Sequence, residues 1–298
     1  MLFDYIIVGA GPSGATIAYC LQKEGANCLI VDKKAKIEEK TCGGLLTWSG
    51  ICTLKNIGFE IHELLEFGAS CINSFLYNKD NRCKLYSYKN GEYGLGITRK
   101  ILDEWILNHA IVSGAKIKWN MIFKDIVQKD EIFKVGDDSA KKIILATGAN
   151  GFLPLDMKHM IKSQTFGMSA QIKGKTNLQE DKVMFYIIGG NEYDYFWIIP
   201  NGNQIWNIGV WFQKVPSNSI EIFWKYKKKI VDRYFQNISF VRQLRGGFCG
   251  NVNLTQHLIN GCYGIGDFAG QNRINTGEGI RYALDSAVIL AEQLLKEK

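Results

Sequence analysis

The chain has 298 residues, of which 46% are hydrophobic, so it can bury a large core in one domain or in two interleaved ones. Its eight cysteines form no CxxC pair and no compact even spacing, which argues against a disulfide framework and against a metal site. The net charge of +7 accompanies no nucleic-acid motif, so no nucleic-acid partner is expected. No apolar run approaches the roughly 20 residues of a membrane span, and the first predicted strand begins close to Met1. We therefore expect a cytoplasmic protein with at most peripheral membrane contact.

The first 32 residues predict a strand, a glycine turn, a helix and a second strand in direct succession. Residues 5–8 and 28–31 are short apolar runs that are typical of buried parallel strands. Gly9 permits a tight turn, Gly11 lets a pyrophosphate approach the backbone, and Gly14 lets the helix pack closely on the strand. This order predicts a dinucleotide site, the alternative being a glycine-rich turn in an ordinary α/β domain.

The ends of these elements supply further candidate ligands for the dinucleotide. Pro12 and Ser13 open the helix, whose N-terminus would hold the phosphates, and Gly25 ends it. Asp32 follows the second strand and is placed to accept hydrogen bonds from the adenosine ribose, with Lys33 beside it.

Two segments before residue 110 are candidates for contact with the same ligand. In the first, Gly43 and Gly44 follow Cys42, although Cys42 could equally be a small buried hydrophobic residue. In the second, Arg99 opens a helix and could bind phosphate oxygens through its planar guanidinium. A surface ion pair with Asp103, four residues later, is the alternative.

Residues 70–93 and 160–215 alternate in the manner of strands and predict a mostly antiparallel sheet inserted into the nucleotide-binding unit. Within it, Tyr195, Trp197 and Ile199 share one face of a strand. They could line an apolar cavity or be ordinary core residues.

Residues 217–235 combine apolar residues at helical spacing with four lysines and an arginine, which predicts a basic amphipathic helix. Such a helix could rest on anionic lipid. Packing on the sheet with a solvated lysine face is the favoured interpretation.

Two more glycine-containing turns complete the pattern. Residues 141–145 predict a strand that runs into the small residues Ala146, Thr147 and Gly148, followed by Asn150 and Gly151. Near the C-terminus, a strand leads into a Gly-Asp pair, a Thr-Gly-Glu-Gly turn and a helix through residue 295. The candidate ligands there are Gly266, Asp267, Gly277, Gly279 and Ile280.

These motifs together resemble the single-Rossmann flavoproteins that include para-hydroxybenzoate hydroxylase, and within them the geranylgeranyl reductase family. One glycine fingerprint is present, rather than the two expected for separate flavin and nicotinamide domains. The Cys-Gly-Gly loop and the Tyr195–Pro200 strand are similar to reductase motifs, with Ile199 in place of Phe. Asn150-Gly151 stands where the family usually has Asp-Gly.

The resemblance implies FAD as cofactor and an α/β fold. It implies a Rossmann-like FAD-binding domain of residues 1–69, 94–159 and 240–298, with a substrate domain of residues 70–93 and 160–239. Arg99 would reach the cofactor phosphates and Asp267 the ribityl hydroxyls, while the helix after Gly279 would direct its positive end toward the flavin.

The implied function is reduction of carbon–carbon double bonds by hydride transfer from reduced flavin. The substrate would be apolar and prenyl-like or smaller, because typical members continue beyond the equivalent of residue 295. The electrons would come from NAD(P)H or a reduced carrier protein, and Cys42, Tyr195 and Trp197 are the candidates near the substrate. A monooxygenase or halogenase is the closest alternative, since the Tyr195–Pro200 strand also resembles a halogenase motif. A non-catalytic flavin electron carrier is the second alternative.

Overall fold

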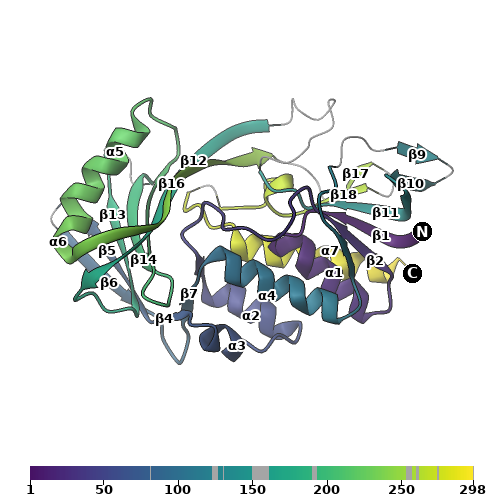
Figure 1. Ribbon diagram of the computed structural model, residues 1–298, viewed down its shortest axis with the longest axis horizontal. Coiled ribbons are helices and arrows are strands. Elements are labelled where there is room, and N and C mark those ends of the chain that lie inside the picture. Colours follow the sequence, from purple (N-terminus) through teal and green to yellow (C-terminus); the bar gives the residue numbers. More distant parts are fainter. Residues whose placement is uncertain are drawn as a thin grey trace.

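The computed structural model contains a parallel sheet with its helices, near both chain termini, and a large antiparallel sheet beside it (Figure 1). It describes residues 1–80, 82–122, 127–129, 131–149, 161–189, 193–252, 257–259, 262–273 and 275–297.

The first sheet is built around β1 (Leu2–Val8), whose apolar residues after Leu2 are buried between two parallel neighbours. The parallel strands follow the order β18 (Cys262–Gly264), β11 (Asp138–Leu145), β1, β2 (Cys28–Val31) and β8 (Lys116–Lys118). Short antiparallel strands extend it, namely β9 (Val127–Lys129), β10 (Ile132–Val135) and β17 (His257–Ile259).

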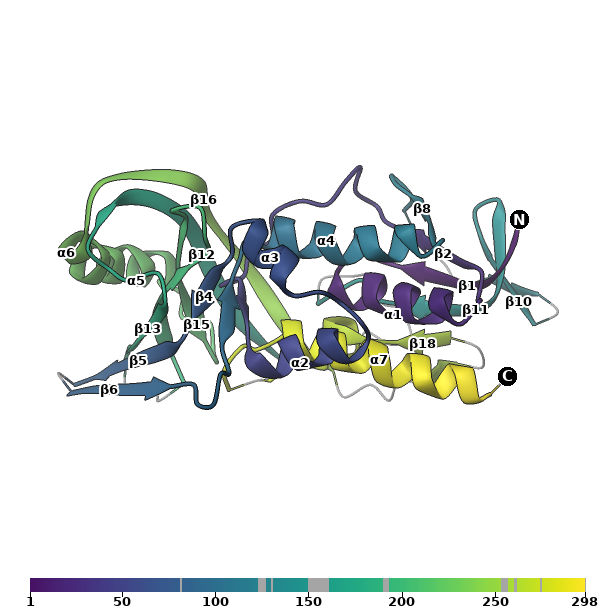
Figure 2. The same ribbon diagram turned by 90° about the horizontal axis from the view of Figure 1, so that it is seen from below.

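Helices cover one face of this sheet and lie side by side in Figure 2. They are α1 (Pro12–Lys23), α2 (Trp48–Asn56), α4 (Arg99–Val112) and α7 (Ile280–Lys296); the short α3 (His62–Glu66) lies below α2 in Figure 1. In α7, Leu284, Ala287, Ala291 and Leu294 recur every three or four residues and are buried in the core that α7 shares with α1 and α2, which explains why this segment is helical.

The second sheet has seven strands and carries the residues that face the nucleotide-binding unit. Its order is β16 (Phe235–Val252), β12 (Ile161–Thr176), β15 (Trp206–Phe212), β14 (Tyr195–Pro200), β13 (Lys182–Ile187), β5 (Ser74–Lys79) and β6 (Arg82–Ser87). Every pairing is antiparallel except that between β13 and β5. Phe196 and Val210 pack in the core on one face, whereas Trp197, Ile199 and Trp211 belong to a separate apolar cluster on the other.

The predicted amphipathic helix is a helical segment on the outer face of the second sheet (Figure 1). It consists of α5 (Ser219–Tyr226), a π-helical turn η2 (Lys227–Val231) and a last turn α6 (Asp232–Tyr234). Phe223, Ile230 and Val231 are buried against the sheet, as the packing interpretation expects. Ile220 and Trp224 stay 56% and 41% exposed.

A small third sheet was not predicted. It joins β3 (Leu45–Leu46), β7 (Gly94–Gly96) and β4 (Ser70–Ile72). Strands of two or three residues from distant segments carry no readable alternation, so local patterns could not reveal them.

The fold class, an α/β unit with a mostly antiparallel sheet inserted into it, is confirmed. The domain boundaries stay a prediction; β16 continues in the second sheet to Val252. Asn150 and Gly151 lie outside the described residues. Within the described part, no helix is both long and apolar enough to cross a membrane.

Candidate functional site

The glycine turn between β1 and α1 packs directly on the end of β11. Gly9 has a φ of +114°, and a Cβ there would lie 2.4 Å from the Ala146 carbonyl oxygen. A Cβ on Gly14 would lie 1.9 Å from the Gly9 carbonyl oxygen. Only glycine fits at these two positions, so the turn stays tight and α1 starts close to the carboxyl end of β1.

The first turn of α1 is open to an anion. Gly11 is its N-cap residue, no side chain caps the helix, and Pro12 stands at the first position. The first N–H groups of a helix have no partner within it, so those of Ser13 and Gly14 can bind phosphate oxygens, whereas the Ala15 N–H already donates to the Gly11 carbonyl. The Lys40 ammonium lies beside this turn, 3.0 Å from where a Cβ of Gly11 would be.

A buried carboxylate links Lys40 to Arg99. Asp103 is fully buried and accepts hydrogen bonds from Arg99 Nε at 2.8 Å and Nη2 at 2.9 Å. Lys40 Nζ lies 3.4 Å from Asp103 Oδ2. Burial opposes the charge of Arg99, but Asp103 and the sulfur of Cys42 outweigh it and raise the pKa of Arg99. Two cations with one carboxylate thus lie near the glycine turn, and Lys40 was missed by the sequence analysis.

Asp32 is held in a fixed orientation at the end of β2. Its carboxylate accepts the backbone N–H groups of Ala10 and Lys34, both at 2.9 Å. The acid therefore closes the glycine turn, at the position where the sequence analysis expects the adenosine ribose. Lys33 is exposed beside it.

The small-residue turn after β11 contains an unsatisfied polar atom. Thr147 Oγ1 is buried and has no hydrogen-bond partner among the described residues. Gly148 has a φ of +76°, and no atom of the described residues, its two chain neighbours aside, would lie within 4 Å of a Cβ at this position. A buried hydroxyl without a partner is costly, so a ligand that accepts from Thr147 suits this place.

The C-terminal motifs meet the glycine turn. A Cβ on Gly266, whose φ is +65°, would lie 2.8 Å from Ser13 Oγ. Asp267 accepts from Asn272 Nδ2 at 3.2 Å, and a Cβ on Gly279 would lie 3.3 Å from Asp267 Oδ1. Burial raises the pKa of Asp267, while Asn272 and the more distant Arg99 and Lys40 lower it. Ile280 begins α7, so the helix starts beside this carboxylate.

The Cys-Gly-Gly loop lies against the second sheet. A Cβ on Gly43 would lie 2.8 Å from Ile199 Cδ1 and 3.6 Å from Trp197 Nε1. Gly44, with a φ of +69°, donates its backbone N–H to Cys42 Sγ at 3.5 Å. The two segments that carry the reductase resemblance are therefore in contact.

The polar tips of the aromatic strand have partners within the protein. Tyr195 donates its hydroxyl to the Thr276 carbonyl oxygen at 2.6 Å, and Trp197 Nε1 donates to Asn207 Oδ1 at 2.8 Å. Burial raises the pKa of Tyr195. Gly277 packs on the ring of Trp211 from β15, so the Thr-Gly-Glu-Gly turn is also docked on this sheet. A substrate is thus not needed to satisfy Tyr195 or Trp197.

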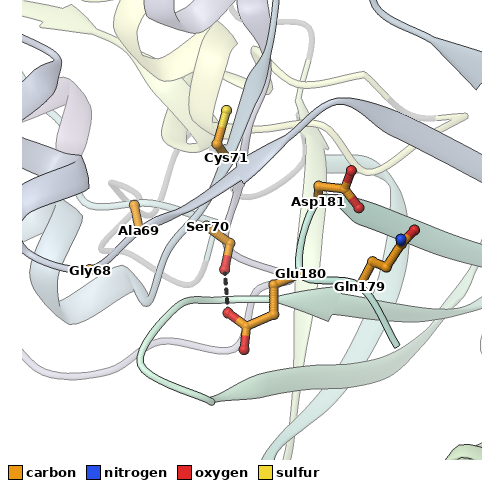
Figure 3. Close-up of a pocket in the computed structure, with 7 residues that line it drawn as sticks. All are labelled: Gly68, Ala69, Ser70, Cys71, Gln179, Glu180 and Asp181. Atoms are coloured by element: carbon orange, nitrogen blue, oxygen red, sulfur yellow. Dashed lines mark hydrogen bonds between the residues drawn. The ribbon is translucent and has the colours of Figure 1, made fainter. Parts of the chain in front are cut away.

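A hollow of about 540 Å³ lies elsewhere, where β4 meets the turn before β13 (Figure 3). Ser70 donates to Glu180 at 3.3 Å across it. None of its lining residues belongs to the set described above, so we assign the function to the glycine-lined site. The described part of the chain holds no group of His, Cys, Asp or Glu arranged to bind a metal ion.

The residues fit FAD. The Lys40 ammonium lies beside a bare glycine turn and an uncapped helix N-terminus, as a pyrophosphate requires, and the buried Asp103 connects it to Arg99. The orphaned Thr147 hydroxyl and the buried Asp267 carboxylate supply polar partners for the rest of a long, hydroxyl-rich ligand.

Comparisons with known proteins agree with this fit. The sequence profile of the FAD binding domain family matches residues 3–246. A digeranylgeranylglycerophospholipid reductase of Methanococcoides burtonii is 23% identical, over 97% of this chain and 74% of the relative.

Two solved structures share the fold. A geranylgeranyl bacteriochlorophyll reductase-like protein of Thermoplasma acidophilum has a TM-score of 0.80 at 18% identity, covering 99% of this chain and 79% of its own. A halogenase variant in complex with FAD has a TM-score of 0.79 at 19% identity, covering 99% and 69%. Because the family match covers most of the chain, the protein belongs to the FAD binding domain family and is an FAD-dependent oxidoreductase similar to geranylgeranyl reductases.

Proposed function

We propose that this protein reduces carbon–carbon double bonds of an apolar substrate, prenyl-like or smaller. The observation that carries this is the contact between the Cys42–Gly44 loop and the apolar cluster of the second sheet. Trp197, Ile199 and Trp211 are each at most 6% exposed and belong to one apolar cluster, which Gly43 approaches at Trp197 and Ile199. An apolar wall beside the flavin suits an apolar chain, which gains by leaving water.

The chemistry requires hydride delivery to one alkene carbon and a proton on the other. Bound FAD, when reduced, supplies the hydride. The protein binds and orients the two partners and excludes water. In this proposal Cys42, Tyr195 and Trp197 lie at the substrate, and NAD(P)H or a reduced carrier protein delivers the electrons.

We assign cofactor binding to residues that share one property, a place on the glycine turns or beside them. They are Gly9, Gly11, Pro12, Ser13, Gly14, Asp32, Lys33, Cys42, Gly43, Gly44, Arg99, Ala146, Thr147, Gly148, Gly266, Asp267, Gly277, Gly279 and Ile280, to which the geometry adds Lys40.

The test is anaerobic photoreduction of the FAD-loaded protein, followed by mixing with alkenes, phenols and quinones. Reoxidation of flavin by an alkene, with a product heavier by two hydrogens, supports the proposal. Turnover of artificial acceptors with no saturable substrate would favour the electron carrier instead.

A second candidate function is a monooxygenase or halogenase. The observation that favours it is the shared fold with a halogenase, together with the halogenase-like strand Tyr195–Pro200. Oxygen-dependent formation of a hydroxylated or halogenated product from an aromatic substrate would replace the reductase proposal.

We further propose a cytoplasmic location in which any membrane contact is peripheral and made by α5 and η2. The exposed Ile220 and Trp224 lie beside the exposed Lys225, Lys228 and Lys229. Exposed apolar residues flanked by cations suit an anionic lipid surface.

A further inference from the structure

A buried amide joins the Cys42–Gly44 loop to the aromatic strand. Asn207 on β15 is fully buried and accepts the Trp197 indole N–H through Oδ1 at 2.8 Å. Its Nδ2 donates to the Cys42 carbonyl oxygen at 2.7 Å. One side chain thus contacts both segments that the proposed function places beside flavin and substrate.

The orientation of this amide is determined by its partners. An indole nitrogen can only donate, and a backbone carbonyl oxygen can only accept. Asn207 must therefore direct Oδ1 to Trp197 and Nδ2 to Cys42. In the flipped amide, the NH2 group would face the indole N–H and the amide oxygen would face the Cys42 carbonyl oxygen, and neither contact is a hydrogen bond. Neither an ionised aspartate nor a leucine can make both contacts.

Hydrogen bonds to backbone carbonyls hold the Cys42–Gly44 loop against the second sheet. The close approach of Gly43 to Ile199 leaves no room for a side chain at this position. The loop therefore depends on hydrogen bonds to its backbone to hold it against the sheet. Asn201 Nδ2 donates to the Gly43 carbonyl at 3.0 Å, and Ser169 donates to the Cys42 carbonyl at 3.5 Å. Ser169 is itself held by Arg242 Nη2 at 2.7 Å.

We propose that Asn207 is a positioning residue that holds the Cys42 loop and the Trp197 indole at one fixed separation. The role rests on the proposed function, because it matters for catalysis only if flavin and substrate meet between these segments. Asn207 acts through Cys42 and Trp197 and touches neither the flavin nor the substrate in this assignment.

The decisive experiment is Asn207→Asp studied across pH. The introduced carboxylate still accepts from Trp197 but faces the Cys42 carbonyl with an oxygen, which repels it. Once protonated, the same carboxyl can donate to that carbonyl and restore both contacts. Burial favours the protonated form. Arg99 and Arg242 interact with the adjoining Cys42, and Arg245 interacts with Arg242; these three cations oppose protonation. Glu39 accepts from Gln171, the residue paired with Asn207 across the sheet, and supports protonation.

We expect FAD to bind the Asn207→Asp protein about tenfold more weakly than the wild type at high pH, with recovery as the pH falls. The visible spectrum of bound FAD and the rate of its reoxidation by substrate should follow the same titration. Asn207→Leu should lose affinity at every pH. Asn203→Asp is the matched control, since Asn203 also donates to a carbonyl, that of Phe67, but on another loop.

Equal affinities and spectra for Asn207→Asp and wild type at all pH values would overturn the proposal, as would the same titration in Asn203→Asp. If the Asn207 variants do not fold, Trp197→Phe removes the indole donor instead, and an unchanged bound-FAD spectrum would overturn it. A wild type that reduces no alkene while the Asn207→Asp spectrum still titrates would reject the proposed reaction and support the positioning role.

Discussion

The proposed role of Lys40 in phosphate binding follows from its place in the folded chain and not from any sequence motif. Its ammonium stands between Gly11 and Asp103, where a pyrophosphate would cross the helix N-terminus. We expect Lys40→Met to weaken FAD binding about tenfold at low salt, because one charge-assisted contact to phosphate is lost. Titration of apoprotein fluorescence with FAD measures this.

Riboflavin, which has no phosphate, separates charge from packing in the Lys40 experiment. Its affinity should not change, and the FAD deficit should shrink at high salt. Lys100→Met is the matched control, since that ammonium lies 4.0 Å from Glu104 on the exposed side of α4. An equal loss for riboflavin would contradict the phosphate assignment.

The buried carboxylate of Asp267 should lower the stability of the apoprotein while it strengthens the binding of FAD. Burial raises its pKa in the folded apoprotein, so the ionised carboxylate costs stability at neutral pH. Asp267→Asn should therefore unfold at a higher temperature than the wild type near neutral pH. The gain should vanish below about pH 4, the ordinary range of an aspartate, because both side chains are then neutral. Thermal melts of the two apoproteins across pH test this.

The same substitution should weaken FAD binding about tenfold, because a carboxylate accepts from ribityl hydroxyls more strongly than an amide. Asp137→Asn, on the exposed turn before β11, is the control for losing one carboxylate. If Asp267→Asn lowered stability and left FAD affinity intact, Asp267 would be a structural residue only.

At the scale of elements, the contact of α1 with β1 depends on one missing methyl group. A Cβ at Gly14 would meet the Gly9 carbonyl oxygen at 1.9 Å and Ala146 Cβ at 3.2 Å. Gly14→Ala should destabilise the apoprotein by about 3 kcal/mol, because the helix must move off the strand. Gly25 has a φ of +80°, but no atom of the described part of the chain beyond its neighbours lies within 4 Å of its Cβ position, so Gly25→Ala should cost only about 1 kcal/mol. Urea unfolding measures both, and equal losses would refute the close-packing argument.

The helical segment on the outer sheet face gives a second prediction at this scale. Wild-type protein should sediment with vesicles that contain phosphatidylglycerol and not with pure phosphatidylcholine. Replacing Lys225 and Lys228 by Gln should weaken this about thirtyfold, at about 1 kcal/mol per lysine. The control pair, Lys116 and Lys134, is exposed on the parallel sheet. Equal loss in both double variants, or no binding at all, would reject the membrane proposal.

At the scale of the whole molecule, local sequence patterns predicted individual strands and helices but not the contacts between distant segments. The observed β2 (Cys28–Val31), β14 (Tyr195–Pro200) and the start of α4 at Arg99 match the sequence analysis, because each has apolar spacing or a turn signal of its own. Lys40 and Asn207 could not be predicted, since their partners lie 63 and 165 residues away. Such contacts arise only when segments far apart in the sequence pack together in the folded chain.

Because the proposed FAD-binding residues come from distant segments, we expect FAD to stabilise the whole fold against unfolding. The proposed binding residues come from segments near positions 11, 40, 99, 147 and 267, so bound FAD would connect most of the chain. At 100 times its dissociation constant it should stabilise the fold by about 2.7 kcal/mol, which raises the melting temperature by about 4 °C for a chain of this size. Calorimetry should show a single transition that shifts as a whole. A scan in which FAD moves one transition and leaves another in place would mean that the second sheet unfolds independently of the cofactor site.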